Sequence, residues 1–452
     1  ERLDHGVEAV RHLVAPGHMF EALGLSYYGP VDGHDTAELL DVLTRVRDLG
    51  GVKLLHVRTE KGRGVPGSQE RYDRAHAAKP QPKPQPKPQT RPQPEAHAKP
   101  QPKAKPKARA PKEVPMEPKV VPPARPKRKG RAWTAWFGEA MEEIAAQNDK
   151  VIVITAAMPD GTGLMQYREK FPERFIDAGI AEQHAVAMAS GLATSGMRPV
   201  AAIYSTFLQR GYDQIFQEVV LQKLPVMFAI DRAGLVGEDG YSHNGMFDIA
   251  YLRTFPNMVL MAPKDGPELR EMLALGLTLD TSCAVRYARG NAPEPGELLL
   301  HGESSKPLEL GKAEVLRRGR DGAILAYGHM VQTALGAAEI LAQQGAHIEV
   351  VNARFAKPLD KQAILTLASR HDHVLTLEDH AVMGGFGSAV LELIAAEGPV
   401  RARFEPVGVP DRFIPHASGS QAREEAGIDA HSVAARLAQG SPSKAPSPTR
   451  VV

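Results

Sequence analysis

The sequence has a single cysteine, Cys283, among 452 residues. One thiol excludes disulfide frameworks and cysteine-based zinc sites. Cys283 opens the apolar run Cys283-Ala284-Val285, which favours a buried strand thiol over a nucleophile and predicts a reducing compartment. The sequence also lacks the ~18 consecutive apolar residues that a membrane-spanning helix needs. It begins at Glu1 without a charged-then-apolar signal pattern, so we expect it to start inside a longer protein.

The bulk composition is that of a globular protein, with one exception. Hydrophobic residues make up 42% and charged residues 24% of the chain, and the length allows about three domains of ~150 residues. The net charge of +2 hides a basic tract from Lys79 to Arg131, rich in Pro, Lys, Gln and Ala. Such a tract favours extended geometry and offers no core. It predicts an interdomain linker; a docking site for an acidic partner is the alternative. Nucleic-acid binding, which needs basic residues on a folded face, is not expected.

Hydrophobic periodicity divides the rest of the chain. Residues 1–77 read as a strand–helix piece too small for its own core, and are predicted to be the C-terminal part of a larger domain. Residues 131–297 and 298–440 each alternate helices with buried strands, which predicts an α/β fold of parallel sheets flanked by helices. Residues 78–130 are the linker and 441–452 a frayed tail. The prediction is therefore two complete domains and part of a third.

The same periodicity places individual elements. Asp35 and Glu38 predict a capping box at the start of a helix, and Phe137, Met141 and Ile144 share one side of another. The run Gly384-Gly385-Phe386-Gly387 lacks the lysine of a phosphate loop, so a tight strand-to-helix turn is expected. Buried strands are predicted over 52–57, 151–154, 200–204, 226–230, 259–261, 284–287, 323–327, 348–351 and 374–377.

Polar and aromatic residues follow several of these strands. Ligands of parallel sheets bind outside the carboxyl ends of the strands. Taken singly, the candidates have structural explanations: Glu182 as a helix-dipole partner, Arg210 as a surface pair with Asp213, His243 as loop decoration. Their accumulation at one rim favours a binding site, formed by Glu182, Tyr204, Phe207, Arg210, Arg232, Asp239, His243 and Arg289.

Several strings resemble one family, the 1-deoxy-D-xylulose-5-phosphate synthases, which are transketolase-like thiamine-diphosphate enzymes. The strings occur in family order and span nearly the whole chain outside the linker and tail. They are Gly29-Pro30-Val31-Asp32-Gly33-His34-Asp35, Gly179-Ile180-Ala181-Glu182-Gln183-His184, Ile203-Tyr204-Ser205-Thr206-Phe207-Leu208-Gln209-Arg210, Asp231-Arg232-Ala233-Gly234-Leu235-Val236-Gly237, Arg286-Tyr287-Ala288-Arg289-Gly290, and Pro406-Val407-Gly408-Val409-Pro410-Asp411-Arg412-Phe413-Ile414-Pro415.

The resemblance implies an activity and its requirements. The family condenses pyruvate with glyceraldehyde 3-phosphate and releases carbon dioxide, which feeds isoprenoid, thiamine and pyridoxal biosynthesis. It uses thiamine diphosphate and Mg²⁺, and it implies a homodimer in the cytoplasm, or in plastids of photosynthetic eukaryotes. Glu182 would contact N1′ of the cofactor's aminopyrimidine and thereby favour the imino form that deprotonates the thiazolium. The cofactor performs the difficult step, and the protein orients and tunes it.

The resemblance also implies roles for other residues. The catalytic set would be Glu182, His76 and His243. The cofactor would contact Glu182 and a group of mostly apolar or aromatic neighbours, namely Val65, Met158, Ile180, Phe207 and Arg210. The substrates would contact Tyr204, Arg232, Asp239, His243 and Arg289. Of these, the two arginines would grip the acceptor phosphate through their forked guanidinium groups.

The chain departs from the family pattern in four places. Val65 replaces a tyrosine that touches the cofactor, and Ala288 replaces a proline before Arg289. In the loop that usually reads Gly-Pro-Thr-His-His-Gly, Tyr241 and Asn244 are new, which leaves the fine substrate preference open. The Gly-Asp-Gly…Asn signature that holds Mg²⁺ and diphosphate is absent, so no metal ligand is assigned. The chain alone is predicted to bind the cofactor poorly and to turn over negligibly.

Two alternative functions remain open at this point. A transketolase or the β subunit of a 2-oxo-acid dehydrogenase would share the glutamate, the aromatic stack and the domain order. The two arginines and the string from Tyr204 to Arg210 favour the synthase. A non-catalytic partner that binds an acidic protein or a membrane through the basic tract is the alternative outside the enzymes.

Overall fold

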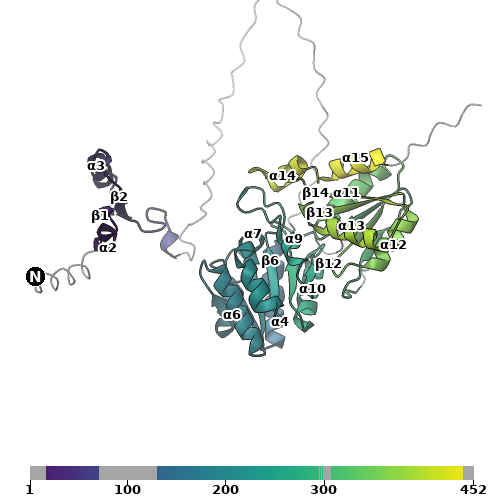
Figure 1. The fold of residues 1–452 in the computed structure, drawn as a ribbon, viewed down its shortest axis with the longest axis horizontal. Coiled ribbons are helices and arrows are strands. Elements are labelled where there is room, and N and C mark those ends of the chain that lie inside the picture. Colours follow the sequence, from purple (N-terminus) through teal and green to yellow (C-terminus); the bar gives the residue numbers. More distant parts are fainter. Residues whose placement is uncertain (1–16, 71–129, 295, 297, 299–306, 441–452) are drawn as a thin grey trace, which may run out of the picture. The chain divides into compact units, whose positions relative to one another are not determined.

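The computed structural model describes residues 17–70, 130–294, 296, 298 and 307–440 (Figure 1). The chain forms two compact units, residues 1–117 and 118–452. Nearly all of the predicted linker, the predicted tail and His76 lie outside the described residues. None of the helices in the described ranges is long and apolar enough to cross a membrane.

The first unit is a small βαβ piece. Strand β1 (Ser26–Asp32) pairs in parallel with β2 (Lys53–Arg58) through helix α3 (Thr36–Arg47), and the short α2 (His18–Ala22) and η1 (Ser68–Glu70) flank them. Asp35 caps α3 by accepting the N–H groups of Ala37 and Glu38. The N-cap is thus confirmed, but the N–H of Asp35 bonds to the carbonyl of Asp32 and leaves the predicted box incomplete.

A seven-stranded sheet forms the first half of the second unit, with strand order β12-β7-β8-β6-β5-β3-β4. All neighbours are parallel except β12, which is antiparallel to β7. This edge strand comes from the C-terminal half of the chain, which the sequence did not indicate. The strands are β3 (Val151–Thr155), β4 (Phe175–Asp177), β5 (Arg198–Tyr204), β6 (Met227–Asp231), β7 (Val259–Met261), β8 (Cys283–Arg286) and β12 (Phe355–Lys357).

A five-stranded sheet forms the second half, with order β14-β13-β10-β11-β9. Its strands are parallel except β9, which runs antiparallel to β11 at the edge. The strands are β9 (Glu314–Arg317), β10 (Ala323–Ala326), β11 (Glu349–Asn352), β13 (His373–Ala381) and β14 (Arg403–Val409). The predicted parallel sheets are therefore confirmed, and the antiparallel edges were missed.

Helices flank both sheets (Figure 1). Around the seven-stranded sheet lie α4 (Trp133–Gln147), α5 (Met165–Lys170), η2 (Pro172–Arg174), α6 (Glu182–Thr194), α7 (Ser205–Leu208), η3 (Gln209–Gly211), α8 (Tyr212–Gln214), the π-helical η4 (Ile215–Val220), α9 (Asp248–Leu252) and α10 (Gly266–Thr278). Around the five-stranded sheet lie α11 (Met330–Ala342), α12 (Lys361–Arg370), α13 (Phe386–Glu397), α14 (Gly419–Ala426) and α15 (Ala430–Gly440).

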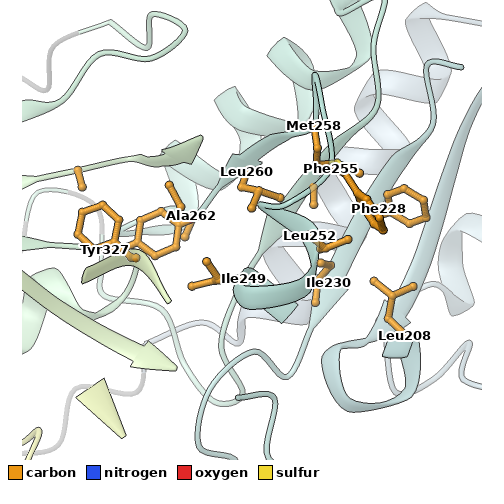
Figure 2. Close-up of a cluster of buried hydrophobic side chains, with 14 of the residues drawn as sticks. Leu208, Phe228, Ile230, Ile249, Leu252, Phe255, Met258, Leu260, Ala262 and Tyr327 are labelled. Carbon is orange, nitrogen blue, oxygen red and sulfur yellow. The ribbon is translucent and has the colours of Figure 1, made fainter. Parts of the chain in front are cut away.

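Both faces of the seven-stranded sheet are buried, as continuous apolar strands require. Val151 and Val153 pack on one face with the residues of α4 and α10, and Ile152 and Ile154 pack on the other with α6 and η4. The core on the face with α6 and η4 continues into the five-stranded sheet. Figure 2 shows it running from Leu208 and Phe228 through Leu260 and Ala262 to Tyr327. Since one apolar core spans both sheets, the loops between them are held from two sides.

Two local predictions are confirmed. Cys283 lies on β8 and is buried, and burial raises the pKa of its thiol to about 12, so it is no nucleophile. The run Gly384–Gly387 turns the chain from β13 into α13. The Glu378 carboxylate accepts the N–H groups of Phe386 and Gly387 at the start of this helix, in the position that a bound phosphate would take.

Candidate active site

The predicted rim exists at the carboxyl edge of the seven-stranded sheet. Strands β3 and β4 end side by side at Thr155 and Asp177, and β5 and β6 end side by side at Tyr204 and Asp231. Strand β8 runs parallel beside β6 and ends at Arg286. The residues that follow these strand ends therefore gather along one edge, where ligands of parallel sheets bind.

Glu182 stands at one end of the rim as the first residue of α6. The turn before it is fixed by the Asp177 side chain, which accepts the N–H groups of Ala157 and Gly179. The Glu182 side chain is buried, and its Oε2 accepts a hydrogen bond of 3.2 Å from Nη1 of Arg210. Arg210 thus pairs with Glu182 and not with Asp213 as a simple helix-surface pair would require.

The surroundings of Glu182 suit a flat, partly apolar ligand. Ile180, two residues before it, is 75% exposed, and Phe207, three residues before Arg210, is half-buried. The hydrogen bond from Arg210 engages Oε2 and leaves Oε1 for another donor. Glu182 therefore presents one carboxylate oxygen that can accept a further hydrogen bond.

An aromatic row runs from Phe207 along the rim. Its ring stacks on Tyr204 with a centroid distance of 5.5 Å and an interplanar angle of 12°. The same ring also meets His243 in a T-shaped contact at 5.5 Å. The guanidinium carbon of Arg232 lies 4.3 Å from the centroid of the Tyr204 ring. Burial raises the pKa of Tyr204, so its hydroxyl remains a hydrogen-bond donor.

Met158 borders the same row, next to Gly161. A Cβ atom on Gly161 would lie 2.2 Å from the Tyr204 hydroxyl oxygen and 2.7 Å from the terminal methyl carbon of Met158. Only glycine allows the chain to pass this close. The glycine carbonyl also accepts a hydrogen bond from Arg232. Nothing in the local sequence indicated this role for Gly161, because its contacts with Tyr204 and Arg232 join segments far apart in the chain.

Arg232 is held by a buried carboxylate. Asp231 is fully buried at the end of β6; its Oδ1 accepts the Arg232 backbone N–H at 2.6 Å and its Oδ2 pairs with the guanidinium. Arg232 adopts a left-handed φ of 55° to make both contacts. Burial raises the pKa of Asp231 to about 7, although the adjacent guanidinium lowers it. Asp231 stood among the strand-end residues, but the sequence did not indicate its contact with Arg232.

Arg289 is held differently, by groups near solvent. Its Nη1 lies 3.0 Å from Oδ2 of Asp239 and donates to the carbonyl of Val236 at 2.7 Å, and its Nη2 lies 3.6 Å from Glu238. Arg289, Glu238 and Val236 line a pocket of about 480 Å³, whose opposite wall includes His329 and Arg423. The structure thus brings Arg289 and Asp239, both among the candidate residues, into direct contact.

His243 completes the site. Its Nδ1 lies 2.9 Å from Oγ of Ser242, and the carbonyl of Ser242 accepts a hydrogen bond from Thr206 at 3.1 Å. These contacts hold the histidine beside Phe207. Val65 belongs to the other compact unit, and His76 lies outside the described residues, so neither can be placed at the rim. Within the described ranges, no group of three or more His, Cys, Asp and Glu side chains could hold a metal ion.

Comparison with protein families agrees with this architecture. Residues 129–295 match the family described as transketolase, pyrimidine binding domain. Residues 311–433 match transketolase, C-terminal domain. Residues 1–59 match the family described as 1-deoxy-D-xylulose-5-phosphate synthase.

Curated relatives extend the match to nearly the whole chain. The 1-deoxy-D-xylulose-5-phosphate synthase 1 of Geobacter metallireducens is 43% identical over 97% of this chain and 65% of its own length. The synthase of Aquifex aeolicus is 44% identical over 94% of this chain and 61% of its own length. The chain thus spans less than two thirds of the length of these relatives.

Solved structures show the same fold. A split-gene transketolase, solved as an inactive β4 tetramer, is 31% identical, with a TM-score of 0.60 over 69% of this chain and 98% of its own. The transketolase of Campylobacter jejuni matches at 19% identity and a TM-score of 0.58, over 69% of this chain and 47% of its own, which shows the fold alone. The chain belongs to the transketolase family, and the curated relatives most of it matches are 1-deoxy-D-xylulose-5-phosphate synthases.

Proposed function

We propose that the natural protein containing this chain condenses pyruvate with glyceraldehyde 3-phosphate, with release of carbon dioxide, and depends on thiamine diphosphate. The observation that carries the proposal is the Glu182 carboxylate, buried at the start of α6 with one oxygen bonded to Arg210. The names of relatives at 43% and 44% identity support the reaction. The product would feed isoprenoid, thiamine and pyridoxal biosynthesis.

The residues at the Glu182 end suit the aminopyrimidine half of the cofactor. Glu182 would share a proton with the ring nitrogen, Phe207 would stack on the ring, and Ile180 and Met158 would cover its apolar edge. Arg210 would keep the carboxylate in place. When bound, thiamine diphosphate supplies an electron sink for decarboxylation, and the protein contributes orientation and electrostatics.

The diphosphate half needs ligands from elsewhere. The described residues hold no cluster suited to a metal ion, so we propose that other residues of the natural protein bind Mg²⁺ and the diphosphate. Val65 and His76 stay candidates from the family resemblance alone. This chain by itself is expected to bind the cofactor weakly.

The other end of the rim suits a phosphorylated aldehyde. Arg232 and Arg289 would bind its phosphate, since guanidinium groups pair with phosphate oxygens in two places at once. Tyr204, Asp239 and His243 would line the cavity beside them. Arg289 is bound to Asp239 at 3.0 Å, so a phosphate must share or displace this contact. His243 lies edge-on to Phe207, between the Glu182 end of the rim and the two arginines. From there it could move a proton on the acceptor carbonyl.

Further properties remain proposals. We expect a homodimer, and a cytoplasmic or plastid location that the single buried cysteine makes chemically reasonable. A second candidate reaction, ketol transfer as in transketolase, is favoured by the 31% identical split-gene protein. The two arginines near one rim favour a phosphorylated acceptor in either case. Release of carbon dioxide from pyruvate separates the two reactions.

Substitution of Glu182 tests the proposal in the natural protein. Glu182→Ala should lower carbon dioxide release from pyruvate by at least ~10²-fold, the scale of a positioned proton-transfer group. Glu173→Ala, an exposed glutamate in η2, is the matched control and should keep wild-type turnover. Rates are measured with and without glyceraldehyde 3-phosphate. Full activity of Glu182→Ala, or ketol transfer from xylulose 5-phosphate without carbon dioxide, would contradict the proposal.

A further inference from the structure

The segment 234–246 between β6 and α9 carries Asp239 and His243 and faces the rim on one side. Asp239 pairs with Arg289, His243 meets Phe207 edge-on, and the carbonyl of Ser242 accepts from Thr206. Most of these contacts involve exposed or half-buried groups. They orient single side chains and do not by themselves fix the backbone of a long segment.

The other side of this segment is bound to the C-terminal domain. The N–H of Leu235 donates to Oδ1 of Asp379 at 3.0 Å, and Asp379 is buried on β13 beside His329. A Cβ atom on Gly234 would lie 2.4 Å from the Asp379 carboxylate. Leu235 and Met246, near the two ends of the segment, pack into the core of the five-stranded sheet. Both ends therefore contact the C-terminal domain, in addition to the seven-stranded sheet, where Arg286 on β8 donates to the carbonyl of Gly245.

Asn244, two residues before the end of the segment, ties its two ends together and to the C-terminal domain. It is 4% exposed; its Oδ1 accepts the N–H of Val236 at 3.0 Å, and its Nδ2 donates to the carbonyl of Ile414 at 3.2 Å. The side chain thus closes the segment on itself and ties it to the stretch after β14. Both of its hydrogen-bonding functions are used in these contacts and none is directed at the substrate residues.

Aromatic contacts extend the same interface. The ring of Tyr241 meets Phe413 edge-on at 6.4 Å and His416 edge-on at 5.6 Å. A Cβ atom on Gly240 would lie 2.3 Å from the His416 ring, so the backbone lies directly against it. Tyr241 and Asn244 are the two residues that depart from the family pattern in this loop. Both contact the C-terminal domain.

We infer that the C-terminal domain positions the acceptor end of the active site, and that Asn244 is the positioning residue through which it does so. Its kinetic consequence rests on the proposed function. Its structural consequence rests on the contacts alone. Loss of the tie should loosen Asp239 and His243 together and leave Glu182, on the other end of the rim, in place.

The test uses Asn244→Ala, Asn244→Asp and Tyr241→Ala in the natural protein. Asn244→Ala removes both hydrogen bonds. Asn244→Asp keeps an acceptor for Val236 but faces the Ile414 carbonyl with a carboxylate oxygen, so it breaks only the tie to the C-terminal domain. Tyr241 is 51% exposed, and its truncation tests the interface without opening a core. Asn148→Ala, at the opposite end of the sheet after α4, is the matched control.

The expected result has a structural and a kinetic part. Amide hydrogen exchange over residues 234–246 should speed up by about 10-fold in both Asn244 variants, the scale of one lost hydrogen bond, and stay unchanged in Asn148→Ala. The KM for the phosphorylated aldehyde should rise by about 10-fold. Decarboxylation of pyruvate without acceptor should stay within about 2-fold of wild type, a split that a general loss of stability would not produce. Tyr241→Ala should change both readouts in the same direction by a smaller factor.

Three outcomes would overturn the inference: unchanged exchange in Asn244→Ala, wild-type behaviour of Asn244→Asp, or equal losses in the acceptor and decarboxylation readouts. Should Asn244→Ala fail to fold, Tyr241→Ala decides by the same criteria. Failure of the proposed function looks different. In that case the wild-type protein releases no carbon dioxide from pyruvate, while the exchange experiment still reports whether the C-terminal domain holds the loop.

Discussion

The two ends of the rim are built in different ways. The Glu182 end comes from one sheet: β4 ends, a turn fixed by Asp177 follows, and α6 begins with the carboxylate. The end proposed to bind the acceptor has contacts with two domains, since the segment that carries Asp239 is tied to Asp379 and Ile414. A strand end and a helix start suffice to place one carboxylate. The long loop at the other end has contacts outside its own sheet.

The two arginines of the acceptor end repeat this contrast on a smaller scale. Arg232 pairs with the fully buried Asp231 and lies over the Tyr204 ring. Arg289 pairs with Asp239, whose side chain is 39% exposed, and with the still more exposed Glu238. Both are proposed to bind one phosphate. Their contributions to folding should nevertheless differ, because only one of them neutralises a charge that water cannot reach.

Truncation of the two arginines should separate these contributions most strongly. Arg232→Ala leaves the Asp231 carboxylate buried without its partner and should lower the free energy of unfolding by about 3 kcal/mol at pH 8. Arg289→Ala breaks only exposed pairs and should cost less than about 1 kcal/mol. Each should raise the KM for the phosphorylated aldehyde by about 10- to 100-fold, since each removes a charged hydrogen bond to phosphate. Urea unfolding and steady-state kinetics of the natural protein provide the two measurements.

Arg289→Ala serves as the control for Arg232→Ala, because the chemical change is the same. Equal losses of stability in the two variants would show that the buried pair of Arg232 with Asp231 stabilises the fold no more than the exposed pairs of Arg289. An increase of KM in one variant alone would assign the phosphate to that arginine.

The pH dependence of stability should sharpen the contrast from the side of the carboxylate. Burial raises the pKa of Asp231 from 3.8 to about 7, so the native state holds its proton more tightly than the unfolded state. The stabilisation from this group is complete below about pH 4 and is lost as the pH rises through 7. Between pH 5 and pH 7 the free energy of unfolding of the wild type should therefore fall by about 2 kcal/mol relative to Asp231→Asn.

Denaturant unfolding of both proteins at pH 5, 6 and 7 measures this difference. The amide of Asp231→Asn cannot titrate, so all other pH-dependent groups cancel in the comparison. If the difference in the free energy of unfolding between wild type and Asp231→Asn stays constant from pH 5 to 7, Arg232 keeps Asp231 charged throughout. If wild type instead becomes more stable relative to Asp231→Asn as the pH rises, the sign predicted here is wrong.

The sequence predicted the regular parts of the fold because they follow local rules. Continuous apolar runs such as 151–154 and 259–261 became buried central strands of the seven-stranded sheet, and Asp35 became a helix cap. The missed strands have weaker local signals. β12 is three residues long and pairs with β7, almost a hundred positions earlier in the chain. β1 contains Gly29 and Pro30 and is largely exposed, so its periodicity is interrupted.

The candidate residues were identified where family motifs mark them, and residues whose place depends on packing were missed. Glu182, Phe207, Arg232 and Arg289 stand in strings that resemble the family, and the structure gathers them along one edge. The roles of Gly161 and Asn244 depend on contacts with segments far along the chain, about 70 and 170 residues away. No local pattern records such contacts, because glycine and asparagine are also ordinary loop residues.

The smallest predicted effect lies at the Glu182 end, where Phe207 is expected to stack on the cofactor ring. Phe207→Ala should weaken thiamine diphosphate binding by the natural protein by about 5- to 10-fold, the scale of one aromatic stacking contact of about 1 kcal/mol. Phe207→Leu keeps apolar volume without an aromatic face and should lie between Ala and wild type. Phe216→Ala, which removes another partly exposed ring that stacks on Phe255, is the control and should leave the affinity unchanged. Calorimetric titration measures all four proteins. Wild-type affinity of Phe207→Leu would show that the ring contributes only apolar contact and no stacking, which would contradict the proposed stack.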